Sequence, residues 1–183
     1  MKEEWIRTEM LLGHDALEHL SRAHVAVFGI GGVGGYVVEA LARSGIGELT
    51  LVDSDRVNLS NINRQIIATH ETVGQNKVDA AAQRVKQIHP DCIIHTYPLR
   101  YEDTNRSLFF TRQYDYIADC IDLVKCKLDL ICTALERGIP ILSAMGTGNK
   151  VDPFQLQITD LSKTEGCPLA RVMRKELRAR GIL

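Results

Sequence analysis

The sequence lacks the features that mark membrane, secreted or strongly charged proteins. No apolar run reaches the roughly 18 residues that a membrane-spanning helix needs. Residues 1–5 do not begin the apolar segment of a signal peptide. The 22 lysines and arginines balance 23 aspartates and glutamates, so no overall field selects nucleic acid or an acidic partner. We therefore expect a cytoplasmic protein with no membrane partner.

Cysteine and histidine patterns do not indicate a structural metal site. The five cysteines are odd in number and form no C-x-x-C pair, which argues against a disulfide scaffold and a zinc ribbon. The six histidines are scattered without ligand spacing, so the sequence assigns them no metal. With 183 residues, 45% of them hydrophobic, the chain can build one sizeable core, and we expect a single domain over residues 1–183.

The clearest positive signal is a glycine-rich turn between a predicted strand and a predicted helix. Residues 25–28 are four consecutive apolar residues, as in a buried strand. Three glycines then match G-x-G-x-x-G, and apolar residues after them recur at helical spacing. The glycines of this loop are Gly29, Gly31, Gly32 and Gly34. Such a turn brings backbone N–H groups close to a phosphate at the start of a helix, so we predict a nucleotide-binding loop.

The rest of the chain alternates predicted strands with predicted helices. Further strands are predicted at residues 48–53, 92–97, 114–119 and 139–145, and helices at residues 14–21, 75–88, 104–113 and from about 122 to 137. This alternation predicts an α/β fold: a Rossmann-like, doubly wound, mainly parallel sheet with helices on both faces.

Three segments follow from this pattern. Residues 1–22 are predicted to be an N-terminal helical segment, and residues 23–150 the nucleotide-binding core. Residues 151–183 are predicted to be an extension, in which residues 154–160 alternate apolar and polar side chains, as in a half-exposed antiparallel strand. Residues 168–180 predict a closing helix rich in arginine and lysine, which would either contact nucleic-acid phosphates or complement the helix dipole.

Polar residues follow the second predicted strand, where a bound nucleotide would lie. Asp53 ends that strand at the distance from the glycines at which a carboxylate accepts ribose hydroxyls. A nicotinamide dehydrogenase and an ATP user fit this much equally well. The loop beyond favours ATP, because Arg64 can form two parallel bonds to phosphoryl oxygens and amides can donate beside it. The other candidate nucleotide ligands here are Asp55, Asn61, Gln65 and Lys77.

A carboxylate follows the fourth predicted strand, at the edge where open parallel sheets bind ligands. Asp122 suits Mg²⁺, which favours one or two carboxylates together with phosphate oxygens. The alternative is that Asp122 caps the following helix, since aspartate is a preferred N-cap residue.

These motifs occur together and in order, and as a set they resemble the ubiquitin-activating-enzyme-like adenylating superfamily of the ThiF, MoeB and HesA type. The motifs are the glycine loop, residues 53–65, residues 74–77 and residues 119–122. Residues 7–13, 144–153, 160–164 and 167–171 further resemble the tRNA threonylcarbamoyladenosine dehydratases of this superfamily. The activators of sulfur carriers usually carry two C-x-x-C pairs, whose absence here favours the dehydratase branch.

The resemblance implies an enzyme that uses ATP and Mg²⁺ to adenylate the carboxylate of N6-threonylcarbamoyladenosine at position 37 of tRNA and cyclises it with loss of water. It implies that the glycine loop and Asp53 hold the nucleotide, that Asn61, Arg64 and Lys77 hold phosphates, and that Asp122 holds Mg²⁺. The implied partners are a tRNA substrate, a second copy of the chain and a sulfur-transfer or cysteine-desulfurase system.

Arg7 matches an arginine that, in this superfamily, crosses the dimer into the partner's ATP site; alternatively it is a solvated charge near the terminus. Leu123 stands where many members have asparagine. Cys167 lies roughly where ubiquitin-type activators carry a thioester cysteine, but no neighbour in the sequence is expected to lower its pKa. The chain stops at Leu183, where the family typically continues, so we expect a C-terminally short form.

Two other functions stay open at this point. One is adenylation of the C-terminal glycine of a ubiquitin-like sulfur carrier. The other is a nucleotide-binding module without turnover, whose role is to bind a partner. A nicotinamide oxidoreductase fits least, because the residues around Arg64 and Lys77 would have no task in it.

Overall fold

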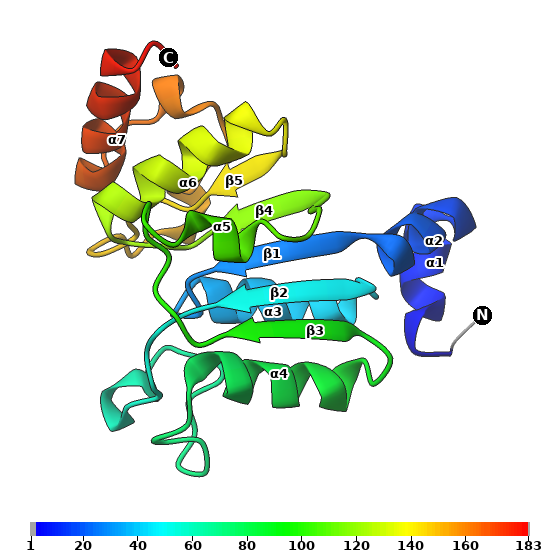
Figure 1. Cartoon of the computed structure of the whole chain (residues 1–183). Coiled ribbons are helices and arrows are strands. Elements are labelled where there is room, and N and C mark those ends of the chain that lie inside the picture. The colour runs from blue at the N-terminus through cyan, green and yellow to red at the C-terminus, as the bar shows by residue number, and fades with distance from the viewer. Residues whose placement is uncertain (1–2, 183) are drawn as a thin grey trace.

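A five-stranded parallel sheet is the centre of the computed structural model, which describes residues 3–182 (Figure 1). Its strands are β1 (His24–Phe28), β2 (Glu48–Val52), β3 (Ile93–Tyr97), β4 (Tyr116–Asp119) and β5 (Ile141–Ser143). They lie in the order β3-β2-β1-β4-β5, and each pairing between neighbours is parallel. From β1 the strands run outward through β2 to β3, and the chain then returns to place β4 on the other side of β1. The strand order therefore reverses between β1 and β4, which confirms the predicted doubly wound fold.

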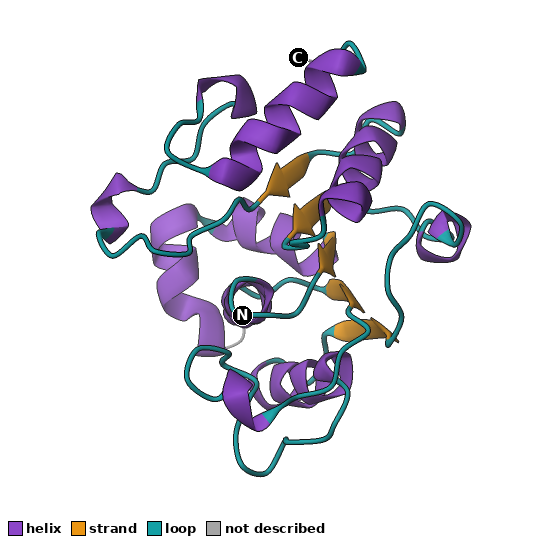
Figure 2. Cartoon of the chain, turned by 90° about the vertical axis from the view of Figure 1, so that its left-hand side faces the viewer, coloured by secondary structure: helices purple, strands orange, loops and turns teal. Residues whose placement is uncertain are grey.

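Helices cover both faces of this sheet (Figure 2). The helices are α1 (Ile6–Leu12), α2 (His14–Arg22), α3 (Gly34–Arg43), α4 (Lys77–Ile88), α5 (Arg106–Phe109), α6 (Val124–Glu136) and α7 (Pro168–Ala179). Short 3-10 helices occupy Glu3–Trp5, Leu59–Asn61, Pro153–Gln155 and Leu161–Lys163. Helices α3 and α4 pack on one face, α6 packs on the other, and α7 packs against α6. None of the described helices is both long and apolar enough to cross a membrane.

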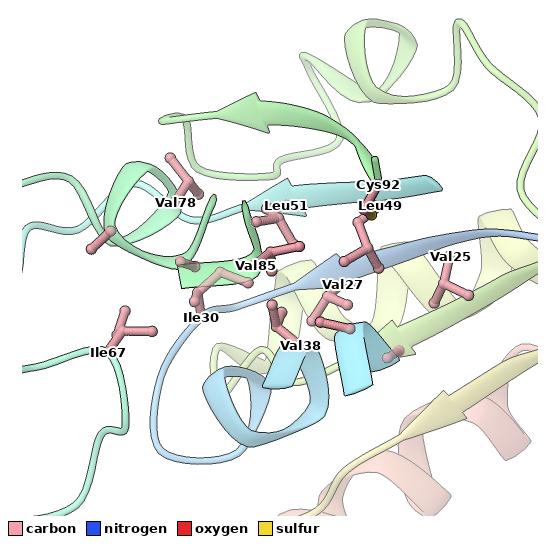
Figure 3. Close-up of a cluster of buried hydrophobic side chains, with 14 of the residues drawn as sticks. Val25, Val27, Ile30, Val38, Leu49, Leu51, Ile67, Val78, Val85 and Cys92 are labelled. Carbon is pink, nitrogen blue, oxygen red and sulfur yellow. The ribbon is translucent and has the colours of Figure 1, made fainter. Parts of the chain in front are cut away.

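The continuous apolar run of β1 is explained by burial on both faces. All five residues of β1 are buried. Val25 and Val27 pack with Val38 of α3 in one core (Figure 3), whereas Ala26 and Phe28 face the second core beneath α6. A parallel strand covered on both sides has no solvated face, so it needs no polar alternation. The central strand therefore places the glycine loop at a fixed point of the sheet.

The predicted antiparallel strand at residues 154–160 is wrong. These residues form no strand; they begin in a 3-10 helix, continue as irregular backbone and are all exposed. Asp152 starts that helix by accepting the N–H of Phe154, and Pro153 lacks a donor for a ladder. Among the residues described here, no strand pairs with this segment. The predicted helix at residues 104–113 also shortens, to the four residues of α5.

Candidate nucleotide-binding site

A cleft of about 880 Å³ opens where β1, β2 and β4 end. Open α/β sheets bind ligands at this edge, beside the switch in strand order. Most residues predicted from the sequence line it. They are Gly29, Gly31, Gly32, Asp53, Asp55, Asn61, Arg64, Gln65, Lys77 and Asp122. Segments far apart in the chain therefore converge on one site.

Two glycines of the loop are required by close backbone contacts. A Cβ at Gly29, whose φ is +88°, would lie 2.7 Å from the carbonyl oxygen of Cys120, and one at Gly34 would lie 1.8 Å from that of Gly29. Gly34 is buried at the start of α3 and does not line the cleft. It therefore allows close packing beneath the loop and does not contact a ligand.

The other two glycines leave open space toward the cleft. A Cβ at Gly31 or Gly32 would meet no atom closer than 3.8 Å. Within the described chain, their N–H groups donate to no backbone carbonyl. Free N–H groups at the start of a helix attract anions. This part of the loop is therefore suited to a phosphate.

Asp53 ties the glycine loop to the loop after β2. Its two carboxylate oxygens accept the N–H groups of Ile30 at 2.6 Å and Asp55 at 2.8 Å. A carboxylate oxygen has a second lone pair, so these bonds leave room for a ribose hydroxyl. Asp53 thus shapes the loop in addition to the ligand role that its spacing predicts.

Two cations approach the cleft in different ways. Lys77, the first residue of α4, is only 6% exposed, and its Nζ lies 2.7 Å from Asp55. Arg64 is exposed and, among residues 3–182, its side chain donates only within its own loop, to the carbonyl of Ser60 and the amide oxygen of Asn63. A phosphate could replace the present partners of both cations. Both partners of Arg64 are neutral acceptors, which bond less strongly than a phosphate would, and Asp55, the partner of Lys77, is open to water.

Two amides complete this wall of the cleft. The side-chain oxygen of Asn61 accepts the N–H of Asn58 and so fixes the turn that carries Arg64. Gln65 is 6% exposed, and its Oε1 is buried without a hydrogen-bond partner among the described residues. Buried polar atoms are almost always bonded in proteins. An unpartnered amide oxygen in a cleft wall fits a bound ligand or water.

Asp122 lies exposed in the cleft, and the capping alternative is wrong. Helix α6 begins at Val124, its N-cap is Leu123, and no side-chain cap bond is formed. Asp122 makes no hydrogen bond or ion pair to the rest of residues 3–182. One free carboxylate facing a phosphate site fits Mg²⁺, which takes its remaining ligands from phosphate oxygens and water.

A buried ion pair under the loop of Asp122 was missed by sequence reasoning. Nζ of Lys127 lies 2.9 Å from Asp119, and both side chains are 0% exposed. Lys127 also donates to the carbonyl of Ile121, while Asp119 accepts the hydroxyl of Ser143. Burial raises the pKa of Asp119, against the opposing effect of Lys127. The sequence does contain a signal for this pair: Lys127 lies on the apolar face of α6, at helical spacing from Leu130, where a charged residue needs a buried partner.

Other lining residues carried no motif. Arg100 and Tyr101 come from the segment after β3, and Thr147 from the segment after β5. They reach the cleft because β3 lies beside β2 and β5 beside β4, so the segments after β3 and β5 begin at the same edge of the sheet. Cys120 also lines it, but burial raises the pKa of its thiol to about 12, which excludes a thiolate at neutral pH.

Two predicted residues lie away from the cleft. Arg7 is exposed on α1, which sits at the opposite end of the strands (Figure 1). Cys167 is the N-cap residue of α7, where burial would raise the pKa of its thiol, but hydrogen bonds with backbone groups, led by that from the N–H of Ala170, outweigh burial and lower this pKa. The expectation that no neighbour in the sequence lowers the pKa of Cys167 is therefore wrong, because the N–H of Ala170, three residues further along, bonds to the thiol at the start of the helix.

Comparison with known proteins shows the family of this chain. A model of the ThiF family matches residues 6–182. The tRNA threonylcarbamoyladenosine dehydratase of Bacillus subtilis is 43% identical over 182 residues, covering 100% of this chain and 72% of that protein. Its namesake in Haemophilus influenzae is 46% identical over 164 residues, covering 90% and 63%. The chain thus spans between about three-fifths and three-quarters of these relatives.

Solved structures agree as well. The crystal structure of the Escherichia coli tRNA N6-threonylcarbamoyladenosine dehydratase superposes with a TM-score of 0.94 at 40% identity, covering 97% of this chain and 74% of that one. The complex of the same enzyme with ATP gives 0.93 at 39% identity, covering 97% and 75%. The chain therefore belongs to the ThiF family and is similar, over its whole length, to the tRNA threonylcarbamoyladenosine dehydratases of that family.

Proposed function

We propose that this chain is an ATP-dependent dehydratase that adenylates the carboxylate of N6-threonylcarbamoyladenosine at position 37 of tRNA and closes it into a ring. The observation that carries the proposal is the convergence, in one cleft, of the free N–H groups of Gly31 and Gly32, the cations Arg64 and Lys77, and the unpaired carboxylate of Asp122. Two cations and a metal-binding carboxylate suit a triphosphate better than a dinucleotide.

Each group has one task in this proposal. The loop N–H groups and the start of α3 bind a phosphate, Asp53 binds the ribose, and Arg64 and Lys77 bind further phosphoryl oxygens. Asp122 would hold Mg²⁺, which, when bound, neutralises phosphate charge. Asn61 and Asp55 position the two cations, through the turn at residues 59–61 and the pair with Lys77. Gln65 would offer its unpartnered Oε1 to the nucleotide or to a water beside it.

The reaction then needs position and electrostatics more than proton transfer. A carboxylate oxygen of the substrate attacks the α-phosphorus, and the bond to the leaving pyrophosphate breaks. The carbamoyl oxygen next attacks the activated carbonyl carbon, AMP leaves with the carboxylate oxygen, and one proton is released. The oxygen lost as water therefore departs on AMP. Fixed cations around the phosphates stabilise the charge that develops in both steps.

The direct test is mass spectrometry of nucleosides from tRNA incubated with the protein, ATP and Mg²⁺. We expect the threonylcarbamoyladenosine to lose the mass of one water, and pyrophosphate to appear only with the modified tRNA. Asp122→Ala should lower turnover by about 100-fold or more with the fold intact. Glu71→Ala, which removes an exposed carboxylate outside the cleft, is the matched control. Full activity of Asp122→Ala would refute the magnesium role.

The same assay separates the alternatives. Pyrophosphate release triggered by a carrier protein ending in Gly-Gly, but not by tRNA, would indicate an activator of sulfur carriers. ATP binding with neither substrate turned over would indicate a nucleotide-binding module. Both outcomes would overturn the dehydratase proposal.

We also infer a homodimer, the substrate contact and the compartment. Arg7 cannot serve its own cleft from the far end of the sheet, and α1 exposes Met10 (80%) and Leu11 (82%), an apolar surface suited to a second copy. For tRNA, α7 offers the exposed cations Arg171 and Lys175. A tRNA substrate makes the cytoplasm the expected site of the reaction. A sulfur-transfer or cysteine-desulfurase partner stays a prediction that no described surface supports.

A further inference from the structure

A second cluster of metal-ligating side chains lies at the end of the sheet opposite the nucleotide cleft. It comprises His24 at the start of β1, Glu48 at the start of β2 and His95 within β3. His24 pairs in register with Glu48, and His95 pairs with Thr50, two residues further along β2. Residues that pair in register, or stand two apart on a strand, share a face of the sheet. Strand register therefore brings the three side chains together.

The ligand atoms are close enough to share one ion. Oε1 of Glu48 lies 2.7 Å from Nε2 of His95 and 3.4 Å from Nδ1 of His24. All three atoms lie within 4.8 Å of one another. Bonds of about 2.1 Å in a tetrahedral zinc site place its ligand atoms roughly 3.4 Å apart. Small side-chain adjustments would give the cluster this spacing.

The second ring nitrogen of His24, Nε2, is within hydrogen-bond distance of another side chain. Its Nε2 lies 2.8 Å from the hydroxyl oxygen of Thr50, and the ring of Tyr114 packs edge-on against it with centroids 4.8 Å apart. Histidine ligands of metals usually bond through their other nitrogen in this way, which fixes the ring and the tautomer. The contact leaves Nδ1 of His24 facing Glu48.

Burial and charge also suit a cation. His24 is 6% exposed, but the side chains of Glu48 and His95 are 28% and 21% exposed, so solvent reaches one side of the cluster. A neutral imidazole is the form that binds metal. Glu48 supplies one compensating negative charge.

From this geometry we propose that His24, Glu48 and His95 form a binding site for a divalent transition-metal ion of the zinc class, with water as the fourth ligand. Two imidazole nitrogens and one carboxylate oxygen favour zinc over magnesium or calcium, which prefer oxygen ligands alone. The ion would join three neighbouring strands at the end far from the nucleotide, and so stabilise the sheet without taking part in ATP chemistry.

The test is a Zn²⁺ titration of the full chain, followed by calorimetry in the absence of ATP and Mg²⁺. We expect one equivalent to bind to the unaltered protein, and Glu48→Gln and His95→Ala to weaken binding by about tenfold or more. His70→Ala removes an exposed histidine outside the cluster and should change nothing. ATP affinity, measured on the same variants, checks that they fold.

Cobalt distinguishes this site from the five cysteines. Co²⁺ bound by His24, Glu48 and His95 should give visible bands without a thiolate charge-transfer band in the near ultraviolet. The proposal is overturned if the unaltered chain binds no Zn²⁺, if Glu48→Gln and His95→Ala bind it as tightly as the unaltered chain, or if the cobalt spectrum shows thiolate ligation.

Discussion

Lys127→Met would remove the positive half of the ion pair that lies under the nucleotide cleft. The substitution keeps the length and apolar stem of the side chain, so it tests charge rather than packing. Asp119 would keep the hydroxyl of Ser143 and the N–H of Ile121 but lose the ammonium 2.9 Å away. A carboxylate that is 0% exposed would then have no counter-charge.

The expected loss is large relative to the stability of a domain. Removing one partner of a buried pair costs about 3–5 kcal/mol, out of the 5–15 kcal/mol that typically separates folded from unfolded protein. The loss should depend on pH. Burial already raises the pKa of Asp119, and without Lys127 the pKa would rise further. A group whose pKa is raised on folding favours the folded state below its unfolded pKa, near 3.9, and this stability is lost as pH rises. The deficit should therefore be smaller at pH 5 than at pH 7.5.

Urea unfolding of the variant and the unaltered chain at both pH values measures this directly. Asp119→Leu combined with Lys127→Met removes both charges and should recover part of the loss, because no charge remains buried. A loss below about 1 kcal/mol, a loss equal at the two pH values, or a double variant no more stable than Lys127→Met would refute the reasoning.

Three further predictions concern the loop, the dimer and the cysteines. Gly34→Ala should abolish folding, because its Cβ would clash with the carbonyl of Gly29. Gly31→Ala should fold, as circular dichroism would show for both variants, and should bind ATP several-fold more weakly. Mixing Arg7→Ala with Asp122→Ala protein should restore part of the turnover that each variant lacks; no recovery would contradict a shared site. Cys167 should be the first cysteine alkylated by iodoacetamide at neutral pH, as peptide mapping would show, because its pKa is lowered.

Local sequence was enough to predict the glycine loop and its place in the fold. The loop needs only a buried strand, glycines at fixed positions and a following helix, all within residues 24–43. Alternation of strand and helix then fixed the parallel sheet, since right-handed crossovers leave few other arrangements. The segment at residues 154–160 failed for the opposite reason. Its alternation is real, but a strand also needs a partner strand, and residues 154–160 pair with none in the described part of the chain.

The parts that could not be predicted depend on which strands are neighbours. Periodicity says which face of an element is apolar, but the meeting of His24 with His95 requires the strand order as well. The contact between Lys127 and Asp119 requires that α6 pack back against the end of β4, the strand before it. The two histidines are 71 positions apart and meet because β2, lying between β1 and β3, brings Glu48 to the same end of the sheet. Spacing within a sequence therefore detects sites built on one turn. In sites built from several elements, each residue appears in the sequence as an isolated polar residue at an apolar strand or helix position. Lys127 on the apolar face of α6 is such a residue, and its charge is the reason to look for a buried partner.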